Sequence, residues 1–223
     1  MAKFAQKRGD ELDLAEYVYS TSSLIVPFIY LLLGKAEEGL QVFAPIMPAF
    51  PYLKAIYLAY LGRDTEVVET LEQLVLARSG IGSAEDVTSA SSDISLMEAA
   101  VIVGHRQAAE LLLNRFTGSK IHTTGGYFTT CIARHLGGAA ALLDRYDEAR
   151  EYYKEAIRVC TEMKFRPELA LSRLGLAELL LDHYPDEKAE AIEHLDFAIN
   201  EFREMKMQPS LERALRRKDI LKA

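Results

Sequence analysis

The chain has 223 residues, of which 49% are hydrophobic and 26% are charged, and its formal net charge is −7. This composition excludes a disordered chain, because the apolar fraction is large enough to build a packed core. The excess of acidic residues also argues against nucleic acid as a partner, since polyanions bind chiefly through clustered lysine and arginine.

The first strongly apolar run, Leu24 to Leu33, has ten residues and includes Pro27. A membrane-spanning helix needs about 20 apolar residues, so this run is about half the necessary length. Acidic residues lie between the basic start of the chain and this run, which is not typical of a signal peptide. The sequence therefore predicts no membrane association and a cytoplasmic location.

Glycines end three apolar runs in the first half of the chain, at Leu33-Gly34, Leu61-Gly62 and Val103-Gly104. Glycine readily adopts the left-handed conformation that closes a helix, whereas a residue with a side chain adopts it at a cost. Each glycine therefore marks the turn between two helices. Two further stretches, Ser79 to Asp93 and Thr117 to Thr130, are rich in small or polar residues and predict loops or frayed helix starts.

A clearer pattern follows, from Leu136-Gly137 through Tyr146 to Ala156, and it predicts a helix-turn-helix unit. Gly137 would let the second helix cross close to the first, Ala149 and Ala156 would keep the contacting face thin, and Tyr153 would fill the gap between helices. The pattern begins again 38 residues later, at Leu174-Gly175. The matching positions of this second unit are Ala191, Leu195 and Ala198.

Both units resemble tetratricopeptide repeats, in which stacked helix pairs bury a face that no single pair can bury alone. We therefore predict an all-α solenoid of about five helix pairs plus a C-terminal capping helix. Residues 1–223 would form one domain, with degenerate repeats over 1–125 and two clearer repeats and the cap over 126–223. In the cap, Leu211, Leu215, Ile220 and Leu221 should dock on the array. A basic cluster should face water and interact with the negative end of the helix; the cluster comprises Arg213, Arg216, Arg217 and Lys218.

The region from Gly126 onward also resembles the C-terminal tetratricopeptide region of large bacterial signalling ATPases, which carry a class III adenylate/guanylate cyclase domain or a LuxR-type DNA-binding domain. The resemblance rests on Gly137, Leu142, the run from Arg145 to Ala149, Met163, Arg166-Pro167, the run from Leu179 to Leu181, Ala191, Leu195, Ala198 and Met205. It implies a regulatory sensing role and supplies no catalytic residue. No P-loop, cyclase motif or DNA-reading helix occurs in these 223 residues, and the cyclase-ATPase arrangement is the closer comparison.

Enzyme signatures are missing as well. None of the five histidines forms an HxxxH or HExxH pair, and Cys131 and Cys160 have no CxxC partner. The sequence therefore predicts no catalytic residue, no metal and no cofactor. The two cysteines are expected to be buried, reduced thiols at helical positions.

We interpret the chain as a non-catalytic interaction module that holds a protein or peptide, such as the cyclase or ATPase domains of the same system, in a concave groove. First helices line that groove in this architecture, so Tyr127, Arg134 and His135 are the candidate groove contacts. A plain solvated face is the alternative for Arg134 and His135. The alternative function is a small-molecule sensor, with a pocket between repeats near these residues and Phe128.

Overall fold

The computed structural model describes residues 26–125 and 129–220, and helices make up most of this part of the chain. Residues 26–32 are helical, and the elements that follow are α3 (Ala36–Val42), the 3-10 turn η1 (Met47–Ala49), α4 (Pro51–Tyr60), α5 (Asp64–Leu71) with the π-helical η2 (Glu72–Leu76), α6 (Ala90–Ile102), α7 (Arg106–Phe116), α8 (Ile132–Leu142), α9 (Tyr146–Glu162), α10 (Arg166–His183), the 3-10 turn η3 (Pro185–Glu187), α11 (Lys188–Met205) and α12 (Gln208–Ile220). The described residues contain no strand, only one isolated bridge between Thr123 and Cys131. The all-α prediction is confirmed.

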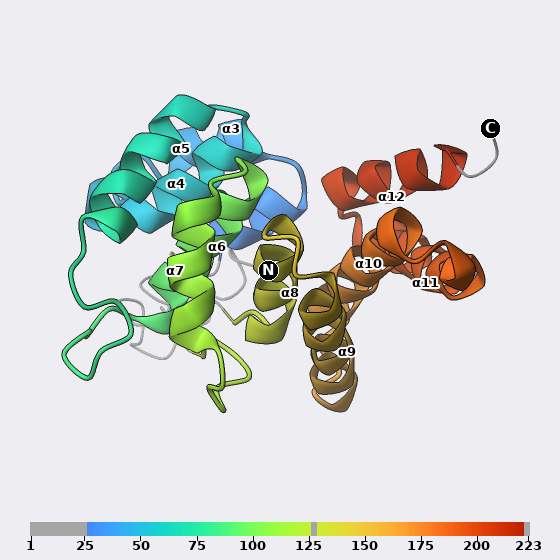
Figure 1. Cartoon of the computed structure of the whole chain (residues 1–223). Helices are drawn as coiled ribbons and strands as arrows, with labels where there is room; N and C mark the ends of the chain where they lie inside the picture. Colours follow the sequence, from blue (N-terminus) through green and yellow to red (C-terminus); the bar gives the residue numbers. More distant parts are fainter. Residues whose placement is uncertain (1–25, 126–128, 221–223) are drawn as a thin grey trace, which may run out of the picture.

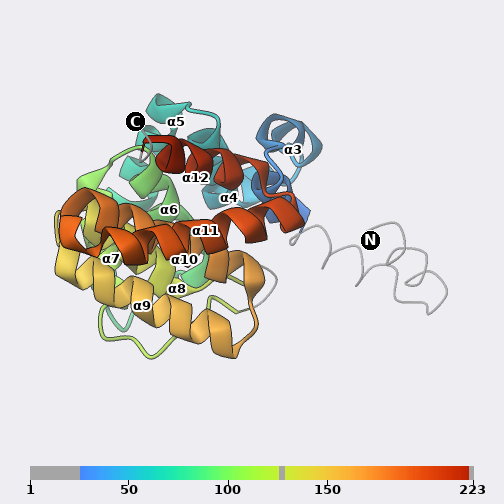
Figure 2. The same ribbon diagram turned by 90° about the vertical axis from the view of Figure 1, so that its right-hand side faces the viewer.

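The helices form consecutive antiparallel pairs, and α12 follows the last pair (Figures 1 and 2). The first helices of neighbouring pairs contact one another in the order α4, α6, α8 and α10, while α5, α7, α9 and α11 lie on the other side of the array. This is a helical-repeat solenoid. The described residues contain the predicted five pairs, beginning with residues 26–32 and α3, and the predicted C-terminal helix.

The turns of the first four described pairs use the left-handed backbone conformation. The backbone angle φ is 74° at Gly34, 69° at Gly62 and 70° at Gly104, as the sequence predicts. Asp144, between α8 and α9, has φ of 63°, and Lys206, between α11 and α12, has φ of 59°, so no glycine marks these turns in the sequence. The turn from α10 to α11 differs, because φ is −131° at Tyr184 and the 3-10 turn η3 follows.

Tyr153 is the central packing residue of the two clearer repeats. Its ring lies between α8 and α10, at positions where both helices carry glycine. A Cβ atom built on Gly137 would lie 2.9 Å from the ring, and one built on Gly175 would lie 2.5 Å from it. Ala149 and Ala156, on the same helix as Tyr153, have no exposed surface. Two glycines and two alanines thus make room for one aromatic side chain.

The array curls until its beginning meets its end. Leu32 packs into the cluster formed by α10, α11 and α12. In the turn that follows, a Cβ atom built on Gly34 would lie 3.1 Å from the ring of Pro209, in the first turn of α12. In Figure 2, α12 lies across the front of the molecule and begins on the side where α3 lies. The first turn of α12 therefore contacts the start of the described array beside the inner face.

Three basic residues of α12 form ion pairs with other helices, and two of them, Arg217 and Lys218, also lie in the last turn of their own helix, as expected. Arg213 binds Glu178 of α10 through Nε at 2.7 Å, Arg217 pairs with Asp182, and Lys218 pairs with Asp196. Of the residues expected to dock, Leu211 and Leu215 pack on the array together with Ala214, as predicted. The expected docking of Ile220 is wrong, because its side chain is exposed. Leu221 lies outside the described residues.

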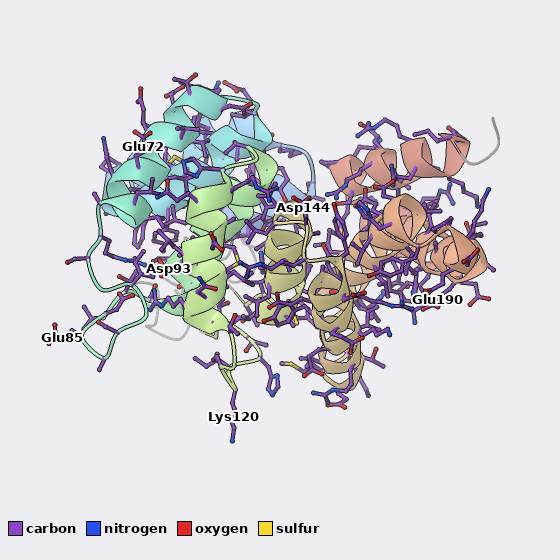
Figure 3. The ribbon with its side chains drawn as sticks, viewed as in Figure 1. Glu72, Glu85, Asp93, Lys120, Asp144 and Glu190 are labelled. Atoms are coloured by element: carbon purple, nitrogen blue, oxygen red, sulfur yellow. The ribbon has the colours of Figure 1, made fainter. Side chains whose placement is uncertain are left out.

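A long loop joins the π-helical η2 to α6, within the stretch predicted from Ser79 to Asp93. The last residues of that stretch belong to α6, and the buried Asp93 carboxylate ties the loop down. Asp93 accepts two hydrogen bonds from Arg78, at 2.9 and 2.7 Å, and also pairs with Arg115 of α7. Glu85 in this loop and Lys120 in the loop after α7 project away from the helices (Figure 3).

The two cysteines are free and buried, as predicted, and they pack in one small apolar cluster. Cys160 lies inside α9. Cys131 is the residue that precedes α8, in extended conformation, so its predicted helical position is wrong. The cause is the bridge to Thr123, which holds Cys131 extended just before the helix begins.

Candidate functional site

A cavity of about 160 Å³ lies on the inner face, beneath α12. Its walls come from successive first helices, from α12 and from the Tyr153 side chain of α9. A smaller cavity of about 60 Å³ continues from it toward residues 28–32 and shares four lining residues with it. The lining of the larger cavity comprises Tyr60, Glu98, Val101, Arg134, His135, Gly138, Tyr153, Leu171, Leu174, Gly175, Pro209, Ser210 and Arg213.

Arg134 is the centre of this site. Its Nε donates to Glu168 Oε2 at 2.8 Å and its Nη2 donates to Glu168 Oε1 at 3.2 Å, which makes a two-pronged ion pair between α8 and α10. Nη2 also lies 3.5 Å from Glu98 of α6. Only 14% of the Arg134 side chain is exposed. Burial disfavours its charge, but the two carboxylates outweigh this and raise the pKa of Arg134 well above its ordinary value.

His135 completes the network as a neutral imidazole. Its Nε2 lies 2.7 Å from the Thr130 hydroxyl and 2.9 Å from Arg134 Nη2, and its Nδ1 lies 3.4 Å from Glu98 Oε2. These contacts suit the tautomer with the proton on Nδ1, because Nε2 can then accept from both neighbours. Burial, and secondly the charge of Arg134, lower the pKa of His135 well below 6.5.

The sequence-predicted groove contacts divide into two groups. Arg134 and His135 lie in one network on the inner face, and the alternative that they merely face water is wrong because both side chains are largely buried. Whether they contact a partner remains a prediction. Tyr127 and Phe128 lie outside the described residues.

Sequence reasoning missed the acidic members of the network, Glu98 and Glu168. Both lie about one repeat from Arg134, at separations of 36 and 34 residues. Neighbouring repeats place corresponding positions side by side. An alignment of the degenerate repeat at α6 with the two clearer repeats would therefore have predicted that Glu98, Arg134 and Glu168 lie close together. The irregular spacing of the first repeats conceals that alignment.

The positions assigned to repeat packing all lie inside the array. Gly137, Gly175 and Tyr153 form the contact described above. The remaining positions, Ala149, Ala156, Ala191, Leu195 and Ala198, have no exposed surface.

Within residues 26–125 and 129–220, no group of three or more histidine, cysteine, aspartate or glutamate residues is arranged to hold a metal ion. No helix in the described part of the chain has the length and apolar character needed to span a membrane.

The fold and the inner-face site define a helical-repeat protein of the solenoid class. Residues 128–201, which cover α8, α9, α10 and most of α11, match the tetratricopeptide repeat family, so this part of the chain is a tetratricopeptide region. Repeats of this family generally mediate protein–protein interactions. No curated protein and no solved structure shows significant similarity to the chain.

Proposed function

We propose that this chain is a non-catalytic regulatory module that binds a protein partner, similar to the tetratricopeptide sensor region of multidomain bacterial signalling ATPases. The partner would be a protein or peptide segment, such as the cyclase or ATPase domains of the same system. We further propose that residues 1–223 act as one repeat domain in the cytoplasm. The continuous helix packing from residues 26–32 to α12 supports the view of one domain.

The observation that carries the proposal is the arrangement of the first helices along the solenoid, whose later part matches the tetratricopeptide repeat family. Each contributes a polar side chain to the same inner face: Tyr60 from α4, Glu98 from α6 and Arg134 from α8. Tyr60 donates a hydrogen bond to Glu98 at 2.8 Å, and Glu98 in turn meets Arg134. Solenoids bind partners through extended surfaces made this way, with one or two contacts from each repeat.

A binding experiment with purified proteins tests the proposal. Candidate cyclase and ATPase domains from the same genome are passed over the immobilised chain, in its original form and as Ser210→Trp. The tryptophan should cover the rim of the inner face, because Ser210 lines the cavity on the first turn of α12. The matched control is Arg158→Ala, on the exposed face of α9, where the arginine bonds only Glu155 and Glu162.

The expected result is saturable binding that Ser210→Trp weakens at least tenfold and Arg158→Ala leaves unchanged, with circular dichroism showing equal helix content. If both variants retain binding, the interface lies outside the inner face. Failure of every domain to bind would count against these partners.

One observation favours a second function, the sensing of a small-molecule effector. The contact between Gly34 and Pro209 joins the two ends of the described array, and beside it the inner face holds a cavity of about 160 Å³, the size of a small molecule. Effector binding in this cavity would change how firmly α12 is held against residues 32–34, and hence the curvature of the solenoid. A thermal-shift screen of metabolites tests this function directly.

A further inference from the structure

The fold brings the two cysteines of the chain together. Cys131 directly precedes α8, and Cys160 lies in the last turn of α9. Neither has exposed surface, and both belong to one apolar cluster with Ala133, Ala156 and Val159. Their thiols are hydrogen-bonded to each other. The sequence contains no other cysteine, so each thiol has a single possible partner within the chain.

The two thiols differ in reactivity because they occupy opposite kinds of helix end. Cys131 stands at the N-terminus of α8, where the helix dipole favours a negative charge, whereas Cys160 stands near the C-terminus of α9. The hydrogen bond with Cys160 lowers the pKa of Cys131, and this outweighs the opposing effects of burial and of Glu168. The same hydrogen bond, together with burial, raises the pKa of Cys160. Cys131 is therefore the thiol that ionises first.

Cys131 adjoins a surface segment rather than the deep core. Its backbone pairs with Thr123 through an isolated bridge, and the amide of Ile132 donates to the His122 carbonyl at 3.0 Å. Residues 117–122, which lead into this bridge, are exposed. Exposed segments with short backbone pairing open at much lower free energy than helices packed in a core. A small oxidant can therefore reach Cys131 while the helix pairs stay folded.

We propose that Cys131 and Cys160 form a reversible disulfide, with hydrogen peroxide as the oxidant, and so act as a redox switch. The Cys131 thiolate attacks one peroxide oxygen and the O–O bond breaks, which gives a sulfenic acid and a hydroxide that takes up the proton Cys131 had lost. The Cys160 sulfur then attacks the Cys131 sulfur. The S–O bond breaks, and the departing hydroxide leaves as water with the Cys160 proton. The two sulfurs lose two electrons, which reduce one peroxide to two waters.

The switch lies beside the network on the inner face. The amide of Cys131 donates to Glu168 Oε2 at 3.0 Å, and the same oxygen accepts from Arg134 Nε at 2.8 Å. A bond between the two sulfurs ties this amide covalently to α9. The redox state of the cysteines therefore acts on the contact between α8 and α10, whichever partner or effector the inner face binds.

Mass spectrometry of the folded full chain tests the proposal. The reduced chain is exposed to hydrogen peroxide, and the remaining thiols are then alkylated. We expect a monomer that has lost two hydrogen atoms, takes up no alkylating reagent and yields one peptide pair joined through Cys131 and Cys160. Dithiothreitol should restore both thiols. The oxidised chain should also melt about 5 °C or more above the reduced chain, because the bond closes a loop of about 30 residues.

Two matched serine variants assign the roles of the thiols. In Cys160→Ser the resolving thiol is absent, so dimedone should trap a sulfenic acid on Cys131. In Cys131→Ser the attacking thiol is absent, so Cys160 should react with peroxide about tenfold or more slowly than Cys131 does. Circular dichroism checks that both variants keep their helix content. If a variant fails to fold, the original chain in a series of glutathione redox buffers decides, because its disulfide content should rise from none to nearly complete.

Two free thiols after peroxide exposure of the folded chain would overturn the proposal, as would disulfides that form only between chains. Faster oxidation of Cys160 than of Cys131 would overturn the order of attack. An oxidised chain that melts below the reduced chain would show that the bond displaces α8 from α9, which contradicts thiols already placed for reaction.

Discussion

The packing of Tyr153 between two glycines predicts that Gly175→Ala destabilises the chain, although the same substitution stabilises most helices. Gly175 is an internal residue of α10, and replacing a helical glycine by alanine ordinarily stabilises a protein by about 1 kcal/mol. Here the new Cβ would lie 2.5 Å from Tyr153 Cε1, about 1 Å inside ordinary contact. On the opposite side the ring packs on the backbone of α8 at Gly137, so closely that a Cβ built there would lie 2.9 Å from it, and the ring therefore has little room to move away.

Overpacking of a rigid core costs about 1–3 kcal/mol, and a ring held on both sides should reach the upper end of that range. Setting about 3 kcal/mol against the gain of about 1 kcal/mol, we expect Gly175→Ala to lower the free energy of unfolding by about 2 kcal/mol. For a chain of this size the melting temperature should fall by about 4–8 °C. Urea denaturation followed by circular dichroism measures the change.

Two comparisons make the test specific. Gly138→Ala is the matched control, because the nearest atoms to its new Cβ are 3.7 Å away, so the substitution should stabilise the chain by about 0.5–1 kcal/mol. In a Tyr153→Ala background the obstacle is gone, and Gly175→Ala should become stabilising by a similar amount. The reasoning would be refuted if Gly175→Ala stabilised the original chain, or if its effect were the same with and without Tyr153.

Three further expectations concern the turns and the buried network. Lys206→Gly should stabilise the chain by about 1 kcal/mol, because Lys206 adopts φ of 59° at the end of α11; an unchanged or lower urea midpoint would contradict this. Arg134→Met should destabilise by about 3–5 kcal/mol, since it leaves Glu98 and Glu168 buried without a cation; a loss under 1 kcal/mol in urea denaturation would show that the pair is not buried in solution. His135 is held neutral in the folded state, with its pKa well below the 6.5 of the unfolded chain, so stability should be lost as the pH falls below 6.5. From pH 7.5 to 5.5 the original chain should lose about 1.4 kcal/mol more than His135→Gln, and equal losses in the two proteins would contradict a neutral buried imidazole.

The sequence alone determined that the secondary-structure elements are helices, and it determined much of the order of the helix pairs along the chain. Apolar positions at three- and four-residue steps dictate helices, and glycine at Gly34, Gly62 and Gly104 dictates where helix pairs turn, because these signals are local. The pattern around Gly137, Tyr153 and Gly175 even indicated which side chain would fill the space between helices. Local rules could also place Arg134 and His135 on a first helix, and hence on the inner face.

Only the tertiary structure decided what that inner face is. Glu98 and Glu168 meet Arg134 because repeats of unequal length nevertheless stack in register, and no local signal carries that register. The contact between Gly34 and Pro209 depends on the curvature summed over every pair, so small rotations at each interface determine whether the array stays open or closes. The same packing turned the basic residues of α12 toward Glu178, Asp182 and Asp196. Helix geometry is a property of nearby residues, whereas a cavity is a property of the whole array.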